Sequence, residues 1–261
     1  MSYSLRSRKN TLTPREGKGM QPSLTLIKKK ALMEMASNRQ AVYRTLALLW
    51  TEPTQELFDQ VQAEPSIIVE LKHCLTRMNP ENSELTAGLQ LLESFFNEEW
   101  PELQQPLTEW RVEFTRLFIG PEHLPCPPYE ACYRERLEDG SFGYLMGETT
   151  LAVKNLYREA GLEVNPPQMP DHISAELEGL ALFTSMEVEA WEKDNKAAVL
   201  RTMQFGQRLL GEHLTQWVPA FCLDVRTSAQ SNYYKALVLL TESYVTLDQA
   251  RSPELYRQAE L

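Results

Sequence analysis

The sequence predicts an all-α protein with a single globular domain of about ten helices. Apolar residues recur at steps of three and four in one segment after another from residue 38 onward, which is the spacing of one helix face. We find no sustained alternation of apolar and polar residues, no Asn-Gly hairpin signal and no repeat of fixed length. The 261 residues, 43% hydrophobic and 24% charged, suffice for one large core.

The first 36 residues differ from the rest of the chain. They hold eight basic and two acidic residues and few large apolar ones, so that +6 here and −16 in the remainder give the net charge of −10. We expect residues 1–36 to be a disordered basic extension. Met20, Met33 and Met35 precede the first expected helix, so an over-long start assignment and a basic tail that touches a partner both stay open.

Five helices are expected in the first half of residues 37–261. Asn38 is a candidate cap for the first, and Pro53 suits the first turn of the second. Asn79-Pro80 ends the third, because the residue before a proline disfavours the helical conformation. The fourth ends before Pro101. The fifth runs from about 101 to 119 and carries the apolar stripe Leu103, Leu107, Trp110, Phe114 and Leu117.

A proline-rich segment follows this fifth helix. Gly120-Pro121 stops the helix, and four prolines fall within residues 121–128. Prolines lose little further entropy when they are ordered, so the segment can hold one shape without secondary structure. Two interpretations stay open. The segment is either a preset wall of a groove, with Tyr129 and Tyr133 beyond it, or a stiff connector between two helices.

The second half of the chain repeats the helical pattern. Residues 134–144 are polar and loop-like, and a helix then runs from about Glu148 to a glycine end at Gly161-Leu162. Three prolines in residues 163–170 form a second stiff connector. Asp171-His172 opens the next helix. Three further apolar stripes follow in residues 199–214, 217–225 and 233–247.

The search for catalytic and ligand motifs gives few candidates. The chain has no Gly-rich phosphate loop and no G-x-S-x-G elbow, and none of its four histidines pair at i, i+4. Asp171-His172 is the only pairing that suggests a metal ligand or a general base, and Asp171 could equally cap a helix. A metal-dependent helical hydrolase built on this pair is therefore the alternative function. We expect no catalytic residue, no metal and no cofactor.

Charge and cysteine usage bear on location and partners. The four cysteines are scattered without a CxxC pair, so we expect free thiols in the cytoplasm. No run of 18 apolar residues and no secretory signal is present, so we expect neither a membrane span nor export. The acidic body argues against nucleic acid and suits a basic partner, or serves solubility alone.

Four motifs in order resemble the TorD/DmsD family, the cytoplasmic chaperones of redox enzymes exported by the twin-arginine route. The resemblance covers residues 38–250, and Gly161-Leu162 before the second proline connector also matches. The motifs that carry it are Arg116-Leu-Phe-Ile-Gly-Pro121, Leu124-Pro-Cys-Pro-Pro-Tyr129, Gly147-Glu-Thr-Thr-Leu-Ala152 and Pro170-Asp-His172.

The resemblance implies binding and not catalysis. It implies a helical part to about residue 162, a proline-rich hinge at 163–171 and a helical part at 172–261. The implied partners are the twin-arginine leader and the body of an apo-molybdopterin oxidoreductase, whose export is delayed until the cofactor is in place. No nucleic acid and no membrane insertion are implied, and the protein would be a monomer or a homodimer that exchanges halves. The sequence supports no defined nucleotide pocket.

The site residues are carried over position by position. Leu117, Phe118, Pro128, Tyr129 and Gly147 fall on the family's groove, and Asp171 and His172 fall on its hinge motif. The chain departs from the family at Glu122, where an aromatic is usual, and at Tyr129 and Tyr133, where tryptophan is usual; no residue separates Pro170 from Asp171. Carboxylates should meet the leader's two arginines, since arginine pairs bidentately with them. The candidate carboxylates are Glu122, Glu130 and Asp171, and Phe114 and Phe118 could equally be core.

Overall fold

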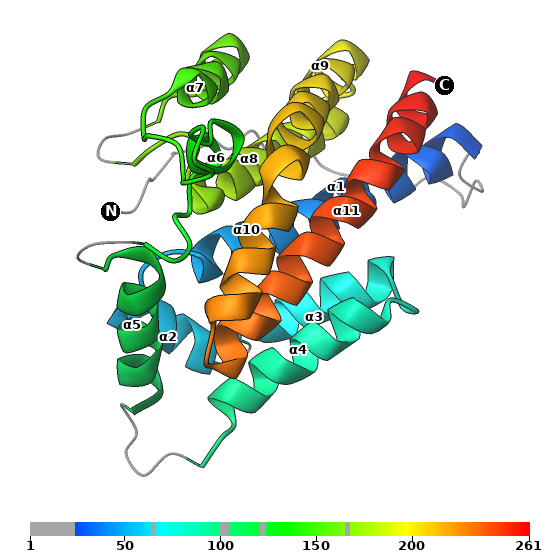
Figure 1. Ribbon diagram of the computed structural model, residues 1–261. Helices are drawn as coiled ribbons and strands as arrows, with labels where there is room; N and C mark the ends of the chain where they lie inside the picture. Colours follow the sequence, from blue (N-terminus) through cyan, green and yellow to red (C-terminus); the bar gives the residue numbers. More distant parts are fainter. Residues whose placement is uncertain (1–23, 64–65, 100–104, 121–123, 165–167) are drawn as a thin grey trace.

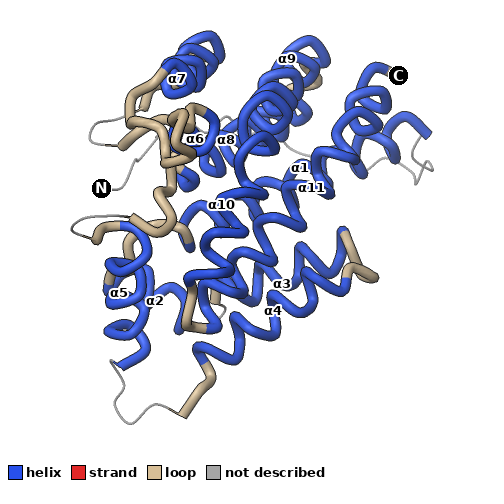
Figure 2. The backbone as a smooth tube through the Cα atoms, viewed as in Figure 1, coloured by secondary structure: helices blue, strands red, loops and turns tan. Residues whose placement is uncertain are grey.

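The computed structural model describes residues 24–63, 66–99, 105–120, 124–164 and 168–261. Within these ranges the regular structure is helical, and the all-α prediction is confirmed (Figure 2). The helices are α1 (Leu24–Leu49), α2 (Gln55–Gln62), α3 (Ile67–Met78), α4 (Ser83–Phe96), α5 (Gln105–Phe118), α6 (Glu130–Arg134), α7 (Glu148–Ala160), α8 (Ile173–Glu192), α9 (Lys196–Arg208), the π-helical turn η1 (Leu209–Leu214), α10 (Thr215–Ser228) and α11 (Asn232–Glu260).

Helices from opposite ends of the chain lie together in the middle of the molecule. The long last helix α11 packs against α4, α10 and α9, and it also contacts α1 (Figure 1). Helix α1 in turn packs along α8, which is flanked by α9. Residues far apart in sequence therefore meet in one helical body. This body has one main core, as expected of a single domain.

The main core is rich in aromatic rings. Trp50, Trp110 and Trp217 are buried, and the Trp110 ring lies 4.4 Å from that of Tyr233, centroid to centroid. Members of this cluster come from α1 through to α11. Such rings bury large apolar areas, and pairs at these distances add about 0.5–1.5 kcal/mol each. All four cysteines are free, as the sequence predicts, and all four are buried.

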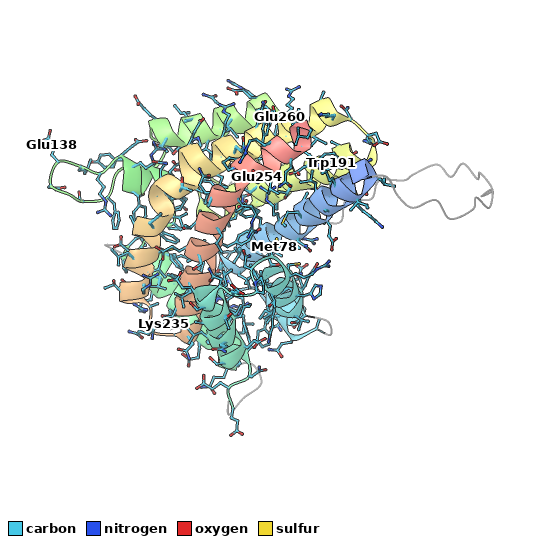
Figure 3. The ribbon with its side chains drawn as sticks, turned by 90° about the vertical axis from the view of Figure 1, so that its right-hand side faces the viewer. Met78, Glu138, Trp191, Lys235, Glu254 and Glu260 are labelled. Atoms are coloured by element: carbon cyan, nitrogen blue, oxygen red, sulfur yellow. The ribbon has the colours of Figure 1, made fainter. Side chains whose placement is uncertain are left out.

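The prediction of disorder for all of residues 1–36 is wrong for residues 24–36, which belong to α1; residues 1–23 lie outside the described part. A second, smaller apolar cluster explains the difference. Leu32 on α1 packs in it with Trp191, which Figure 3 labels at the end of α8, and with Leu255 and Ala259 of α11. The basic composition of these residues favours disorder, whereas packing against two distant helices stabilises the helix. Asn38 consequently lies inside α1 and does not cap it.

The C-terminal stripes also join where the sequence suggested separate helices. Helix α9 runs directly into the turn η1 and then into α10, without a break in the helical backbone. The helix at residues 148–160 does end as predicted. Gly161 adopts the left-handed conformation with φ 81°, and the Leu162 N–H donates to the Tyr157 carbonyl at 2.8 Å.

A buried ion network ties α1, α8 and α11 together. The Arg39 guanidinium donates to both carboxylate oxygens of Asp248, at 2.9 Å and 3.0 Å, and to Glu187 at 3.2 Å. The Tyr43 hydroxyl donates to the same Asp248 carboxylate at 2.6 Å. Arg39 is 5% exposed and Asp248 is 1% exposed, so removing Arg39 would leave buried carboxylate charge without its cation.

Replacing Arg39 with methionine should destabilise the protein strongly. Asp248 and Glu187 would lose their cation while still buried, and breaking such a pair costs about 3–5 kcal/mol. Urea unfolding at neutral pH measures this loss. Arg44→Met, at an exposed position of the same helix, is the matched control and should change stability by no more than about 0.5 kcal/mol. Equal behaviour of the two variants would contradict the assigned role.

Candidate functional site

Two segments that the sequence singled out meet in the structure. Tyr129 and His172 form an antiparallel bridge, in which the Glu130 N–H donates to the Asp171 carbonyl and the Ile173 N–H to the Pro128 carbonyl, both at 2.9 Å. The Tyr129 and His172 rings lie edge to face with centroids 5.1 Å apart. The end of the proline segment is thereby fixed to the start of α8. Pro128, Tyr129, Asp171 and His172 thus come together, although they are more than 40 positions apart in sequence.

Asp171 lies at the centre of this junction and is fully buried. Its Oδ2 accepts from the Ala131 N–H at 3.2 Å and from the Thr150 hydroxyl at 2.9 Å. The prediction that Asp171 caps the helix following it is wrong. His172 is the cap of α8, and its Nδ1 accepts from the Ser174 N–H at 3.1 Å. The carboxylate instead serves the first turn of α6, a short helix that the sequence analysis missed.

Leu117 and Phe118 lie in the main core. Leu117 is fully buried and Phe118 is 7% exposed, with its ring against Trp50, Phe114 and Tyr234. Packing is therefore their observed role, which was one of the two interpretations for Phe118. Their part in binding a leader stays a prediction.

The other predicted positions divide between surface and interior. Tyr133 is 8% exposed, and its ring packs against Phe142 and Trp217. Pro128 is buried, whereas Tyr129 and His172 are half-buried. Glu122 lies outside the described residues.

Gly147 has a structural reason to be glycine. It precedes the first turn of α7, and the Glu135 carboxylate lies against it, accepting from the Thr149 N–H at 2.6 Å. A Cβ at position 147 would fall 1.9 Å from a Glu135 carboxylate oxygen. The hydrogen bond from Thr149 lowers the pKa of Glu135. Glycine at this position therefore lets Glu135 act as the cap of α7.

Buried carboxylates surround the junction. Glu130 is fully buried and bonds to Arg134 at 2.7 Å and to His213 Nδ1 at 2.9 Å. Glu176 is also fully buried and accepts from the Trp217 indole N–H at 3.3 Å. One oxygen of Glu176 and one of Asp171 have no hydrogen-bond partner among the described residues. Glu130 and Asp171, two of the predicted arginine-binding carboxylates, thus face the interior.

Burial shifts the proton affinities of these groups. It raises the pKa of Asp171 and raises that of Glu176 well above the ordinary glutamate value, with the Glu130 carboxylate adding to the rise at Glu176. Burial also lowers the pKa of His172 to about 4. A neutral His172 agrees with its Nδ1 accepting the Ser174 N–H. Asp171 and His172 are therefore occupied in holding helix starts. Among the described residues, no group of three or more His, Cys, Asp and Glu side chains could hold a metal ion.

The comparisons with known proteins agree with this arrangement. Residues 79–223, more than half of the chain, match the family described as nitrate reductase delta subunit. A protein of Salmonella typhi named Tat proofreading chaperone DmsD is 30% identical over 175 residues, which cover 61% of this chain and 76% of that one. The chain belongs to the TorD/DmsD family of redox-enzyme maturation chaperones.

Three other similarities have lower sequence identity. The "Probable Tat proofreading chaperone DmsD" of Haemophilus influenzae is 28% identical, over 53% of this chain and 58% of that protein. The chaperone TorD of Vibrio cholerae is 22% identical, over 59% of this chain and 67% of that protein. A solved structure from Archaeoglobus fulgidus, described as that of a redox enzyme maturation protein, covers 89% of this chain and 99% of that one with 18% identity and a TM-score of 0.46. The relatives are named as chaperones and not as enzymes.

Sequence reasoning missed the buried ionic residues of this TorD/DmsD chain. Glu176 follows Ile173 by three positions and precedes Leu180 by four, so it stands on an apolar stripe. Arg39 stands three before Val42 on another such stripe. A charged residue on the buried face of a helix signals a buried partner, because an unpaired charge there would be costly.

None of the described helices is long and apolar enough to cross a membrane.

Asp171→Ala should destabilise the protein by about 2–6 kcal/mol. The substitution leaves the Ala131 N–H and the Thr150 hydroxyl buried without their acceptor, at about 1–3 kcal/mol each. Asp171→Asn keeps an acceptor oxygen and should cost less than about 1 kcal/mol. Urea unfolding measures both, with Asp59→Ala at an exposed position of α2 as the control. An alanine variant as stable as the asparagine variant would rule out the junction as a source of stability.

Glu176→Gln should raise stability at pH 8 by an amount on the order of 1 kcal/mol, because a tenfold change in proton affinity is worth about 1.4 kcal/mol. The folded-state pKa of Glu176 lies above its unfolded value. Its favourable contribution is therefore complete below the unfolded pKa and is lost as the pH rises through the folded pKa.

The measurement is urea unfolding of the wild type and the variant at pH 5 and pH 8. The variant's advantage should grow with pH, while the effect of His172 is common to both proteins and cancels. Glu192→Gln, exposed on the same helix, should show no such growth. An advantage that shrinks as the pH rises would show that Glu176 is stabilised in its charged form.

Proposed function

We propose that the protein is a cytoplasmic chaperone that binds the twin-arginine leader of an apo-molybdoenzyme and delays export until cofactor insertion and folding are complete. The observation that carries the proposal is the likeness to proteins named Tat proofreading chaperone, one of them 30% identical over three quarters of its own length. The family model named for the nitrate reductase delta subunit supports a redox-enzyme client.

The geometry of the junction supports binding over catalysis. The Asp171 carboxylate is enclosed and bonded to α6 and α7, and the His172 ring nitrogen accepts from its own helix. Their side chains are therefore fixed by the fold. Tyr129 and His172 remain partly accessible and in contact, so they offer an amphipathic surface to a peptide. A net charge of −10 favours a basic peptide and speeds its encounter with the protein.

Two further features belong to this proposal. The chaperone contacts the body of the molybdopterin oxidoreductase catalytic subunit as well as its leader. The connector at residues 163–171 acts as a hinge, and the protein is a monomer or a homodimer that exchanges its halves at this point. These features follow from the family resemblance, and the bridge between Tyr129 and His172 supports a fixed point at the end of the connector.

Calorimetric titration with leader peptides of molybdoenzymes tests the proposal. We expect a Kd of about 1 µM or lower, equivalent to about −8 kcal/mol. The affinity should fall between 50 and 500 mM salt, because part of it comes from pairing between arginine and carboxylate. A leader of the same length without the arginine pair is the control and should bind more weakly with less salt dependence. Absence of binding by every leader tried would refute the proposed function.

A further inference from the structure

A small groove lies between the end of α7 and the first half of α8. It has a volume of about 190 Å³, and its apolar lining comes from Tyr157, Leu162, Val164, Ala175 and Leu182. This volume is below the roughly 300–1,000 Å³ of sites that enclose small molecules. The groove therefore suits one or two side chains of a peptide better than a cofactor or a nucleotide.

The groove is held open by fixed contacts. Tyr157 donates its hydroxyl to the Ala175 carbonyl at 3.0 Å, and its ring fits against Gly179, where a Cβ would fall 2.7 Å from the ring. Helix α7 ends at Gly161, whose left-handed conformation turns the chain away so that Leu162 folds back on Tyr157. The walls are therefore set before a guest arrives, which lowers the entropic cost of binding.

The charge of the groove is one-sided. Glu163 and Glu178 are the charged residues among the described residues that line it, and both are exposed. Neither forms an ion pair within the described part of the chain, although Glu178 accepts a hydrogen bond from Gln168 at 3.5 Å. Several other exposed glutamates do form ion pairs, and Glu159 pairs with Arg208. Two carboxylates that have no cationic partner among the described residues thus flank the apolar lining.

Leu182 is an exposed apolar side chain on one wall of the groove. It is 43% exposed, whereas its neighbours Ala181 and Phe183 are buried. The groove also begins near the predicted site, because Ala175 follows His172 by three positions. A guest needs a cation for the carboxylates and an apolar residue close by for Leu182. A leader with two arginines followed by an apolar stretch has both, and arginine matches a carboxylate bidentately.

We propose that this groove takes an arginine of the twin-arginine leader, with Glu163 and Glu178 pairing with its guanidinium and Leu182 contacting the apolar residues that follow. This inference rests on the proposed function and assigns the carboxylates to positions other than those predicted from the sequence. Glu130 and Asp171 are buried. The exposed carboxylates of Glu163 and Glu178, which line the groove beside α8, are therefore the acceptors for the leader.

The test is a double-mutant cycle measured by calorimetry at 50 mM salt. The probes are a leader peptide with two consecutive arginines and the same peptide with both replaced by glutamine. The variant Glu163→Gln/Glu178→Gln should bind the arginine peptide about fivefold more weakly than wild type, with a smaller loss at 500 mM salt. Replacing the arginines should cost the wild type more than it costs the variant, because the two changes remove the same interaction. Glu189→Gln/Glu192→Gln, with both residues exposed at the far end of α8, removes the same two charges and should bind like wild type.

A second arm tests the apolar wall. Leu182→Ser should weaken binding about threefold at both salt concentrations, since apolar contact is little screened by salt. Leu223→Ser, at a leucine 58% exposed on α10, should bind like wild type. Thermal unfolding of each variant shows that the fold is intact.

The outcomes separate the two proposals. If the wild type binds no leader, the proposed function and this groove both fail. If the wild type binds and the glutamine variant binds equally well, or the cycle is additive, the groove assignment alone fails. A change in oligomeric state with unchanged peptide affinity would assign the groove to a second copy of the chain and also overturn it.

Discussion

The junction at Asp171 is the constraint on which the candidate site depends. Its backbone pairs with the end of the proline segment, and its side chain accepts from α6 and α7 while α8 begins two residues later. Four pieces of the chain thus share one buried residue. The carboxylate is enclosed, so its hydrogen bonds are worth more than exposed ones and are costly to leave unmade. The Pro-Asp-His motif therefore has a structural explanation that needs no catalytic role.

The helical architecture could be predicted from spacing and end signals alone. Gly161 illustrates why, since a glycine followed by an apolar residue has one common use at a helix end and adopts it here. The failures occur where packing between distant segments overrides local composition. Residues 24–36 are basic, yet Leu32 packs in one apolar cluster with Trp191 and Leu255 from two other helices. Local composition does not specify which distant helices pack against a segment, so the basic composition of residues 24–36 favoured disorder.

The candidate site could be predicted in part. The pairing of Tyr129 with His172 brings together two motifs that sequence order alone keeps apart, and the family resemblance pointed to both. The orientation of the acidic residues could not be predicted. Glu130 is one of the carboxylates expected to pair with the leader's arginines, yet its side chain is buried against Arg134 and His213. Whether a carboxylate is free to meet a guest depends on such partners, which only the folded arrangement supplies.

These acidic residues fall into two physical classes with different consequences for binding. The enclosed ones are bound to backbone N–H groups, an indole or a cation of the chain itself, and burial raises the pKa of Asp171 and Glu176. Opening them to a guest would require breaking the contacts that hold α6, α7 and α8 together. Glu163 and Glu178 need no such rearrangement, because they already face solvent beside an apolar wall. An arginine reaching them exchanges water for a charged partner and leaves the fold as it was. Recognition of a basic leader by this route is therefore compatible with a rigid helical body. Recognition through Asp171 would instead break hydrogen bonds that stabilise the fold.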